Sequence, residues 1–474
     1  MDSNPFPEDQ EEFRDKISTV DDTGKRVWVF PKKPAGRFYN ARIWLSLFLL
    51  ILLIGIPFIK VGGEPIMLFN VLERRFILFG IHFMPQDFHL FGLAMLTLVV
   101  FIILFTVVFG RIFCGWVCPQ TIFMELVFRR IEYWIEGDAN QQRKLAASPW
   151  TTEKVIRKLS KHAIFFAIAV VVSNTFLAWI IGADQVMKIA TDPLNQHMGG
   201  FIAMLVFSFA FYFVFSYLRE QVCIAICPYG RLQGVLLGKD SIVIAYDHVR
   251  GEPRGKIRKE TPKAAVQAET KLGDCIDCKL CVHVCPMGID IRNGQQLECI
   301  TCALCIDACD EVMDKIERPR GLIRYDSFTG IEEGRKKIFT PRVIAYSVVL
   351  GVLLIVNVLL LSARTDIETN LFRTGGSLFN KVDEQTLSNT YNYTMVNKTR
   401  EDMPVEFRLA GSPGEIKVIG KAPVAQSGEK TEGTLLIYMQ RENLSGRKTE
   451  LHIEVYSNGE LVDKTKTNFF GPGK

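Results

Sequence analysis

The sequence has little net charge for its length, few charged residues overall, and no even spread of cysteines. Its 474 residues carry a formal charge of +5, and only 23% of the side chains are charged. This small charge is distributed over many loops, so nucleic-acid binding is not expected. Eight of the 12 cysteines lie between Cys275 and Cys309. A secreted disulfide scaffold is therefore excluded, because it would distribute its cysteines through a short chain.

Apolar sequence is abundant: 48% of the residues are hydrophobic and the mean hydropathy is +0.16, typical of a chain partly embedded in a membrane. Five stretches approach the ~20 residues that a membrane-spanning helix needs: Ile43–Ile59, Leu90–Phe109, Ala163–Ile181, Gly199–Tyr217 and Val343–Leu361. Ile66–Met84 is also apolar, but Glu73, Arg74 and Arg75 interrupt it and predict an interfacial or looped segment. The first stretch follows a charged tail (1–42), too late for a cleavable signal peptide.

The distribution of Lys and Arg orients these stretches. Basic residues gather in the tail, in the loop 110–162 and in the segment 219–342, whereas the alternate connections hold only Lys60, Arg74, Arg75 and Lys188. Because cytoplasmic loops carry an excess of Lys and Arg, these three segments are predicted to be cytoplasmic. The sequence thus predicts a four-helix membrane domain (43–218), a fifth helix (343–361) and a C-terminal domain (362–474) outside the cytoplasm.

A tandem cysteine repeat marks the segment around residues 270–315. Cys275-x2-Cys278-x2-Cys281-x3-Cys285-Pro286 is repeated as Cys299-x2-Cys302-x2-Cys305-x3-Cys309, with Asp310 replacing the proline. In bacterial two-cluster ferredoxins this spacing binds one cluster by three close thiolates, and the fourth completes the neighbouring cluster. It predicts two 4Fe–4S clusters, one held by Cys275, Cys278, Cys281 and Cys309 and the other by Cys299, Cys302, Cys305 and Cys285. A pair of zinc sites is the alternative. We expect His283, inside the motif, to tune or shield a cluster.

The other four cysteines form a second repeat. Cys114-x3-Cys118-Pro119 follows the second apolar stretch, and Cys223-x3-Cys227-Pro228 follows the fourth. If the helices continue through these motifs, positions i and i+4 place both sulfurs of a pair on one face, before the proline breaks the helix. Two such pairs would present four soft thiolates near the membrane surface, which suit Cu(I), zinc or an iron–sulfur site. Buried inert cysteines and a thiol–disulfide relay are the alternatives.

Histidine and methionine gather at the opposite ends of the same stretches. His82, Met84 and His89 precede the second stretch, and Met187, His197 and Met198 precede the fourth. By the predicted topology, both groups lie on the outer side of the membrane. Such side chains can bind copper, and two histidines can bind haem. Only the ligand type supports a metal here, so packing or polar anchoring is the favoured interpretation and haem is not expected.

The C-terminal residues 362–474 have a different pattern. Short alternating runs, such as Glu406–Leu409, Glu415–Val418 and Leu451–Val455, predict half-buried strands, and Asn458-Gly459 predicts a hairpin turn. We expect a β-sandwich that docks a partner outside the cytoplasm. The basic, Pro- and Glu-containing segment Arg250–Lys271 predicts a solvated strap ahead of the ferredoxin module, with a lipid-headgroup contact as the alternative.

The order of these features resembles the FixG/CcoG (RdxA) family of cytochrome c oxidase accessory proteins. The C-x3-C-P pairs and the ferredoxin repeat are shared with the NapH and NosR membrane polyferredoxins, but NapH lacks the C-terminal domain. The resemblance implies an immunoglobulin-like fold for that domain, a bacterial inner membrane location with the domain in the periplasm, and a role in assembling a cbb-type oxidase by reducing Cu(II) to Cu(I). Asp310 departs from the motif, which leaves cluster ligation intact and the following turn less defined.

The resulting hypothesis is a cupric reductase. An unknown cytoplasmic donor reduces the two clusters, and electrons pass to copper at the candidate catalytic residues Cys114, Cys118, Cys223 and Cys227. Cu(I) then leaves toward a copper exporter, a chaperone or oxidase subunits. The alternatives are an electron conduit between quinol or the donor and a partner protein, and a scaffold that positions oxidase subunits through the β-domain. Membrane lipid and a second copy of the chain, in a homodimer, are further candidate partners.

Overall fold

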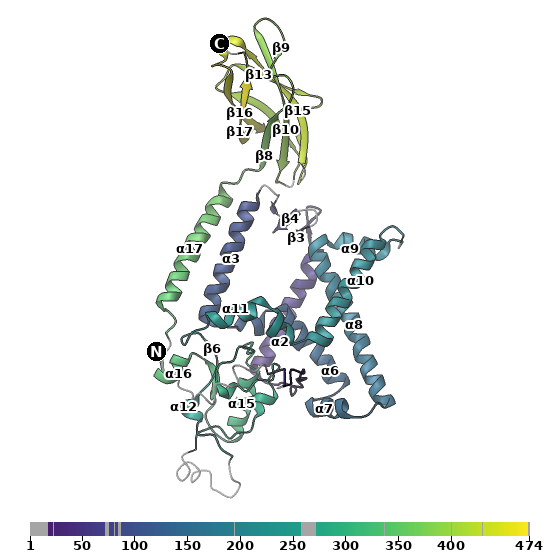
Figure 1. Ribbon diagram of the computed structural model, residues 1–474, viewed down its shortest axis with the longest axis vertical. Coiled ribbons are helices and arrows are strands. Elements are labelled where there is room, and N and C mark those ends of the chain that lie inside the picture. Colours follow the sequence, from purple (N-terminus) through teal and green to yellow (C-terminus); the bar gives the residue numbers. More distant parts are fainter. Residues whose placement is uncertain are drawn as a thin grey trace. The chain divides into compact units, whose positions relative to one another are not determined.

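The computed structural model describes residues 18–472, apart from residues 22, 72–74, 80, 84–86, 194, 257–271, 336, 400 and 429. The chain forms two compact units (Figure 1). Unit 1 contains residues 1–56, 95–178 and 183–353, and unit 2 contains residues 57–94, 179–182 and 354–474. Both units therefore draw on segments that are distant in the sequence.

Five helices in the described chain are long and apolar enough to cross a membrane, which confirms the five predicted stretches. They are α2 (Arg37–Gly55), α3 (Phe88–Phe109), α8 (Thr152–Ile181), α10 (Met198–Phe213) and α17 (Pro341–Ser362). A 3-10 turn, η2 (Ile56–Phe58), extends α2, and a π-helical segment, η5 (Val214–Leu218), extends α10. The helix α8 begins 11 residues before the predicted stretch (163 minus 152). Its first turns carry Lys and Arg, which favour helix but lower the hydropathy.

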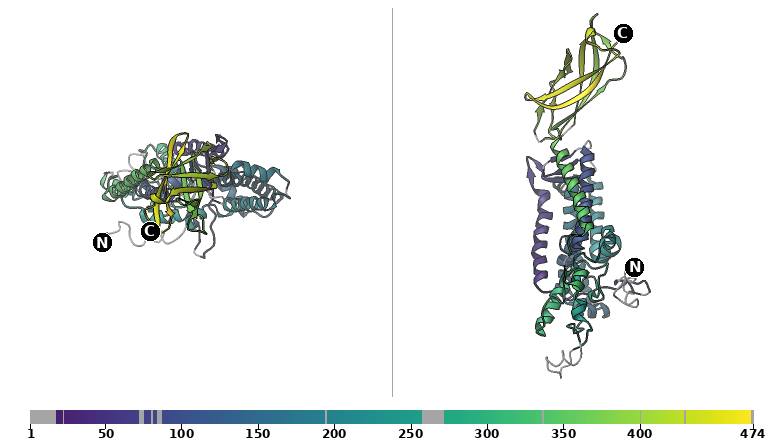
Figure 2. Two further views of the ribbon diagram at one scale, coloured as in Figure 1. Left: turned by 90° about the horizontal axis from the view of Figure 1, so that it is seen from above. Right: turned by 90° about the vertical axis from the view of Figure 1, so that its left-hand side faces the viewer.

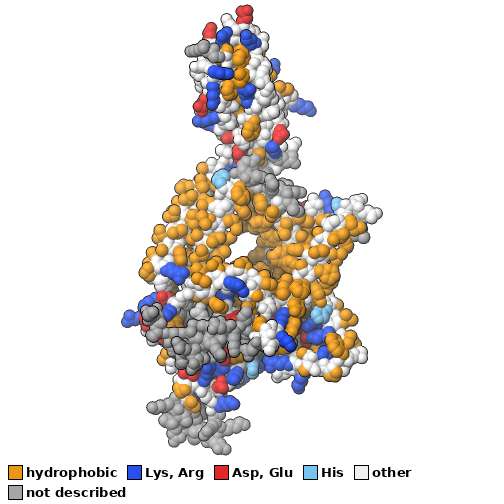
Figure 3. Space-filling model, in the orientation of Figure 1, with side chains coloured by type: hydrophobic (Ala, Val, Ile, Leu, Met, Phe, Trp, Pro, Cys, Tyr) orange, Lys and Arg blue, Asp and Glu red, His pale blue; other side chains and the backbone are white. Residues whose placement is uncertain are grey.

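The surfaces of these helices are apolar. Trp44, Val171, Val206 and Leu359 are all more than half exposed. In Figure 3 hydrophobic side chains cover the helical region, whereas charged side chains lie mainly beyond it. A large exposed apolar area of this kind indicates a surface that contacts a membrane or a partner protein. Together with the length of the helices, it identifies a multi-pass membrane protein.

The apolar segment between α2 and α3 forms short strands rather than a sixth membrane helix. In unit 2, β3 (Met67–Asn70), β4 (Arg75–Leu78) and β5 (Ile81–Phe83) pair as an antiparallel sheet, preceded by the hairpin β1 (Lys60–Val61) and β2 (Glu64–Pro65). Ile77 in the central strand is fully buried. The prediction that this segment does not span the membrane is confirmed.

The tandem cysteine repeat folds as a module of unit 1. Strands β6 (Val243–Tyr246) and β7 (Ile323–Asp326) pair antiparallel and bracket the module. Between them lie α12 (His248–Gly251), α14 (Leu280–His283), the 3-10 turn η7 (Ile291–Asn293) and α15 (Leu304–Lys315), followed by α16 (Phe328–Glu333). The module therefore extends beyond the predicted cysteine segment at both ends. Most of the predicted strap, residues 257–271, lies outside the described residues.

The connection between α3 and α8 also belongs to unit 1. It contains α4 (Ile112–Trp116), α5 (Pro119–Thr121), the π-helical η4 (Ile122–Phe128), α6 (Arg129–Ile135) and α7 (Ala139–Ala147). After α8 comes α9 (Ala183–Thr191), and after α10 come the π-helical η6 (Val222–Ile226) and α11 (Pro228–Leu236). These short helices carry the C-x3-C-P motifs.

The C-terminal domain in unit 2 is a two-sheet β-sandwich (Figures 1 and 2). One sheet has the order β13–β15–β10–β8, with β9 (Asn380–Lys381) on β10, and the other has the order β12–β16–β17. The bounds of these strands are β8 Ile367–Arg373, β10 Thr386–Asn397, β12 Glu406–Ala410, β13 Gly414–Ile419, β15 Lys430–Gln440, β16 Lys448–Ser457 and β17 Glu460–Phe470. The short strands β11 (Met403–Pro404) and β14 (Val424–Ala425) pair with each other. In the sequence, β11 follows β10 and β14 follows β13. Both sheets bury alternate residues in one core, for example Tyr391, Leu435 and Ile453.

The predicted Asn458-Gly459 turn joins β16 to β17. Both residues have positive φ, 49° and 85°. Two successive left-handed residues are what a type I′ hairpin turn requires, and its twist matches that of the strands. The predicted hairpin is confirmed.

A buried carboxylate, Asp87, precedes α3 in unit 2. It accepts hydrogen bonds from Arg364 Nη2 and Lys398 Nζ, both at 2.7 Å. Burial by itself would raise the pKa of Asp87, but the hydrogen bond from Lys398 and the charge of Arg364 outweigh it and hold the pKa below the usual value. The resulting stabilisation is present above the ordinary carboxyl pKa of ~3.9 and is lost as pH falls through the lowered folded value.

We expect Asp87→Asn to lower the free energy of opening of unit 2 by about 1–3 kcal/mol at pH 7, because two cations lose their carboxylate. Hydrogen exchange of β8 in the detergent-solubilised protein measures this, and wild type and variant should converge as the pH falls. Glu406→Gln, in the exposed pair with Arg408, is the control and should change less than about 0.5 kcal/mol. Equal exchange rates in Asp87→Asn and wild type at pH 7 would contradict the prediction.

Candidate metal centre

The first predicted cysteine set lines one cavity of the ferredoxin module. Cys275, Cys278, Cys281 and Cys309 surround it, over a floor that includes Tyr246, Leu322 and Ile323. Cys278 is exposed to solvent, whereas Cys275 and Cys281 are buried. Burial raises the pKa of Cys281 and of Cys309 to about 12. This cavity therefore has one solvent-facing edge, at Cys278.

The second predicted set lines a separate cavity. Cys285, Cys299, Cys302 and Cys305 surround it, together with Ile244, Ile289 and Leu304. None of these four cysteines is exposed. The helix α15 serves both cavities, because it carries Cys305 and Cys309. The structure thus brings together the two sets that the spacing predicts, with each fourth cysteine exchanged between the repeats.

The two repeats also share a backbone conformation. Asp277 and Lys279 flank Cys278 with φ of 51° and 57°, and Thr301 and Ala303 flank Cys302 with φ of 56° and 65°. Left-handed φ at non-glycine residues is uncommon and costs energy, so its recurrence at equivalent positions indicates a functional constraint. In both repeats it curls the chain around the central cysteine.

The donor set fits a 4Fe–4S cluster better than a single ion. A zinc ion would draw its four sulfurs to ~2.3 Å from one centre, whereas thiolates that bind the corners of a cubane line a wider cavity. The apolar walls and the exclusive use of thiols match such a cluster, and the role of each cysteine as its ligand remains a prediction.

The C-x3-C-P motifs differ from the expected continuous helices. Cys114 lies in α4, but Cys118 is extended (φ −60°, ψ 123°) and caps α5, which begins at Pro119. Cys227 is likewise extended (φ −69°, ψ 113°) ahead of α11, which begins at Pro228. Proline is favoured at the first position of a helix, where its missing N–H has no partner. The motif therefore ends one helix and starts another, and the expectation of an i, i+4 pair on one continuous helix is wrong.

The two motifs are nevertheless structural repeats of each other. The amide of Cys118 donates to Phe113 O at 3.0 Å, and the amide of Cys227 donates to Val222 O at 2.8 Å. Each is a bond to the fifth residue before it, the pattern of a π-turn, which is frequent at functional sites. The second cysteines of the two motifs, Cys118 and Cys227, thus have the same local geometry, whereas Cys114 lies in an α-helix and Cys223 in a π-helical segment.

All four thiols of these motifs lie within electrostatic range of one another. Burial raises the pKa of Cys114 to about 11 and that of Cys223 to about 12, and the other cysteines of the set raise both further. The Sγ atom of Cys114 is 3.6 Å from Gln233 Oε1, and Arg111 donates to Gln233 and to the carbonyl of Gly230. The structure thus gathers Cys114, Cys118, Cys223 and Cys227, all partly buried, into one group, called here the four-thiol site. A soft metal that binds there must displace thiol protons.

The four-thiol site packs directly on the loop of the second cavity. A Cβ atom at Gly115 would lie 2.4 Å from Ile300 O and 2.9 Å from the Cys302 amide nitrogen. Cys114 and Cys223 also contact the buried cluster of side chains that contains Ile300, Cys302 and Leu304. Only glycine permits this approach of two backbones. The solvent-facing first cavity, the buried second cavity and the four-thiol site therefore form a series.

The first membrane helix is anchored to the same module. Asp307 of α15 accepts from the amides of Phe38 and Tyr39, at 3.1 and 2.9 Å, in the first turn of α2. A side chain at Gly36, whose φ is 137°, would collide with this carboxylate. Amides in the first turn of a helix lack partners within it, and a carboxylate there also complements the helix dipole.

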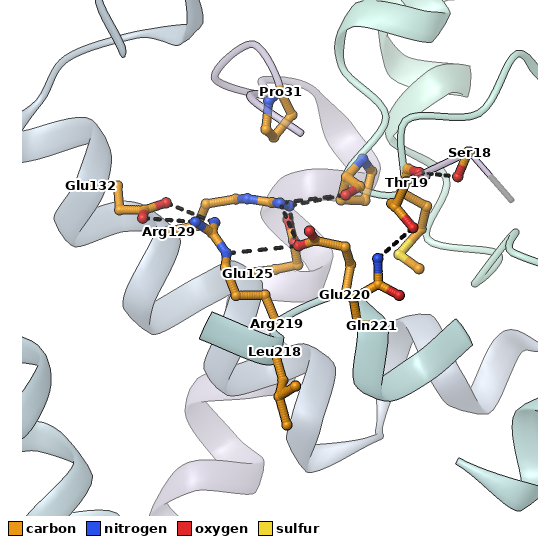
Figure 4. A network of polar contacts seen from close by, with 12 residues as sticks. Ser18, Thr19, Pro31, Glu125, Arg129, Glu132, Leu218, Arg219, Glu220 and Gln221 are labelled. Carbon is orange, nitrogen blue, oxygen red and sulfur yellow. Dashed lines mark hydrogen bonds and ion pairs between the residues drawn. The ribbon is translucent and has the colours of Figure 1, made fainter. Parts of the chain in front are cut away.

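A buried network of charges, which the sequence did not indicate, lies beside the second cavity (Figure 4). Arg129 is 1% exposed, pairs with Glu125, and approaches Glu220 at 3.7 Å. Its Nη atoms lie 3.4 Å from the carbonyl of Pro286, the residue after Cys285. Arg219 forms two bonds to Glu132, of 3.0 and 2.8 Å. The sequence showed these arginines only as part of a basic loop. In the sequence, the one sign that Glu125 pairs with Arg129 is their i, i+4 spacing within an apolar run.

The remaining candidates receive less support. His283 is exposed, so its side chain does not shield a cluster, although its carbonyl accepts from the amide of Lys32. His82 and Met84 lie outside the described side chains. His197 is 3.2 Å from Asp192, and Met187 and Met198 are about half exposed, as in polar anchoring.

Three family models match the chain. One described as a 4Fe-4S dicluster domain matches residues 218–328, and one described as a 4Fe-4S binding domain matches residues 91–137. The third, described as the IG-like fold at the C-terminal of FixG, matches residues 358–472. These matches support 4Fe–4S binding and the expected immunoglobulin-like class of the β-sandwich.

Full-length relatives agree. Protein RdxB of Cereibacter sphaeroides is 34% identical over 442 residues, which cover 89% of this chain and 88% of the relative. Protein RdxA of the same organism is 35% identical, with 82% and 83% covered. The nitrogen fixation protein FixG of Rhizobium meliloti is 34% identical, with 84% and 82% covered. Since similarity of this level extends over all segments of the fold, the chain is a 4Fe–4S electron-transfer protein of the membrane that belongs to the FixG/RdxA family.

Proposed function

We propose that the protein passes electrons through its two cluster sites to Cu(II) at the four-thiol site and releases Cu(I) for assembly of a cbb-type cytochrome c oxidase. The observation that carries this proposal is the contact of Gly115, next to Cys114, with the Ile300–Cys302 backbone. Four thiols gathered beside an electron-transfer module would serve little purpose unless they received its electrons. Thiolates favour Cu(I) over harder ions, so this site suits the reduced product.

The chemistry is a one-electron transfer. When bound, the 4Fe–4S clusters supply one electron for each Cu(II), which becomes Cu(I). The four thiols bind the metal with loss of their protons, and burial, which raises the pKa of Cys114 and of Cys223, opposes that loss at these two residues. Gln233 and Arg111 fix the position of the Cys114 side of the site. Burial excludes water and with it competing ligands.

Orientation and partners belong to the same proposal. The N-terminal tail, the loop 110–162 and the segment 219–342 with the ferredoxin module face the cytoplasm of a bacterial inner membrane, and the β-sandwich faces the periplasm. The exposed Cys278 edge receives electrons from a cytoplasmic donor. A copper exporter, a copper chaperone or the oxidase subunits receive the Cu(I), and the β-sandwich docks the partner on the periplasmic side.

A second candidate is an electron conduit whose four-thiol site holds a further iron–sulfur cluster. The observation that favours it is the match of residues 91–137 to a 4Fe-4S binding domain. This range has only two cysteines, Cys114 and Cys118. A complete four-cysteine site would therefore need Cys223 and Cys227, which the structure places beside them. In that case electrons would leave to a partner or quinone without free copper.

The test combines iron analysis with copper reduction. The purified protein is reduced without oxygen, mixed with Cu(II), and followed by cluster absorbance and a Cu(I) chelator. We expect cluster oxidation matched by Cu(I), and loss of both in the Cys114→Ser/Cys118→Ser/Cys223→Ser/Cys227→Ser variant while about eight irons per chain are retained, as two cubanes require.

A double variant of the outer histidines, His89→Ala/His197→Ala, serves as the control and should keep full activity. A wild-type content of about twelve irons that falls by four in the serine variant would instead establish the conduit. Copper reduction that persists in the serine variant would refute the four-thiol site as the place of reduction.

A further inference from the structure

Arg42 is an unusual residue for the first turns of a membrane helix. It lies in α2 and is only 1% exposed. Its Nε atom donates to the carbonyl of Gly115 at 2.9 Å. Its two Nη atoms are buried and have no hydrogen-bond partner among the described residues. An unpaired buried guanidinium is costly, so its retention indicates an acceptor that the protein chain itself does not supply.

The position of Arg42 identifies the missing acceptor. Gly115, which holds the guanidinium, packs on the backbone of Cys302 in the second cavity. The docking of α2 on α15 by Asp307 fixes Arg42 about one helical turn further along the same helix. The free Nη atoms thus lie next to the second cavity on a rigid element.

The first cavity has a different electrostatic environment. Its nearby arginine, Arg292, donates to Asp290 at 2.6 and 2.8 Å and to Asp277 at 2.6 Å. The donors of Arg292 are therefore taken up by two carboxylates, while Lys279 and Arg254 add positive charge near them and Asp310 adds negative charge beside Cys309. At the second cavity the two Nη atoms of Arg42 stay free to donate. Arg111 adds positive charge there, because its own partners, Gln233 and the Gly230 carbonyl, are neutral, whereas Glu125 and Glu298 add negative charge.

We propose that Arg42 donates hydrogen bonds to the sulfur atoms of the 4Fe–4S cluster in the second cavity and makes it the higher-potential member of the pair. A cluster held by four thiolates is an anion that becomes more negative on reduction, so positive charge and donors to its sulfurs favour the reduced form. Electrons then move from the solvent-facing first site toward the site that contacts Gly115. This inference needs only the two clusters and is independent of copper reduction.

The test is a redox titration of the full-length protein, followed by absorbance and electron paramagnetic resonance. We expect two midpoint potentials in the wild type. In Arg42→Gln the higher one should shift to a more negative value while the lower one stays unchanged, and in Arg42→Lys the shift should be smaller. Cys278→Ser, which alters only the first site, assigns the lower potential to that site.

Arg130→Gln is the matched control, because it removes an exposed arginine from neighbouring α6. It should move neither potential. If both potentials of Arg42→Gln equal those of the wild type at full iron content, Arg42 only positions its neighbours and does not affect the clusters. That result overturns the proposal. If Arg42→Gln loses iron from the second site, Arg42→Lys decides the question: an unchanged higher potential in that variant also overturns the proposal.

Discussion

Gly115→Ala is expected to leave both cluster sites assembled but to slow the reduction of Cu(II) by about a hundredfold. The added methyl group would lie 2.4 Å from Ile300 O and 2.9 Å from the Cα and amide nitrogen of Cys302. Backbone atoms cannot move aside as the end of a side chain can, so the two segments must separate. A displacement of about an ångström between reacting groups can cost a factor of this size.

The measurement is the rate at which the reduced clusters are reoxidised by Cu(II), with iron content determined on the same sample. Gly92→Ala is the control, because a Cβ atom there meets nothing within 4 Å. It should reduce copper at the wild-type rate. A Gly115→Ala protein that reduces copper as fast as the control would show that electrons reach copper by another route.

Removal of the Arg129 charge should have the largest effect on stability. Arg129→Met leaves the buried Glu125 without its ion-pair partner, whereas Glu220 keeps Arg26 at 2.8 Å and Arg219 at 3.7 Å. Breaking a buried pair from one side costs about 3–5 kcal/mol, because the remaining charge is desolvated and uncompensated. The variant also loses the contact with the Pro286 carbonyl next to Cys285. We therefore expect iron–sulfur absorbance to bleach at a much lower temperature.

The chain contains a matched pair for comparison. Glu153 and Arg157 have the same i, i+4 spacing on α8 at 2.6 Å, but their side chains are 71% and 40% exposed. Arg157→Met should cost less than about 1 kcal/mol, since exposed pairs contribute little. Equal bleaching temperatures for Arg129→Met and Arg157→Met would mean that the buried network does not stabilise the cluster module.

The features predictable from the sequence depend on local patterns. Hydropathy located all five membrane helices because a spanning helix must be apolar over its whole length. Alternation and the Asn458-Gly459 pair located strands and one hairpin. The tandem spacing predicted two sets of four cysteines, and each set lines one cavity, with Cys281 lining both; their role as cluster ligands stays a prediction.

The features that escaped prediction depend on contacts between distant segments. Nothing local in Gly115 indicates that it faces Ile300, and Arg42 looks like an ordinary cytoplasmic charge at the start of a span. The proline predicted a break after Cys118, but not that the first helix already ends at Trp116, because proline at the first position of a new helix resembles proline at the end of an old one. The charges in residues 66–84 excluded a span but did not reveal the small sheet.

The anchoring of α2 by Asp307 has a consequence for biogenesis. The amide of Tyr39 and the carboxylate that it contacts are 268 residues apart in the chain. At about 5–20 residues per second, a ribosome needs roughly 13–54 seconds to make that interval. During this time the first turn of α2 is already synthesised but its acceptor does not exist. The membrane domain is thus completed only after the helix that serves both cluster cavities has emerged, so the insertion of iron–sulfur clusters and the final placement of the first membrane helix become one step of maturation.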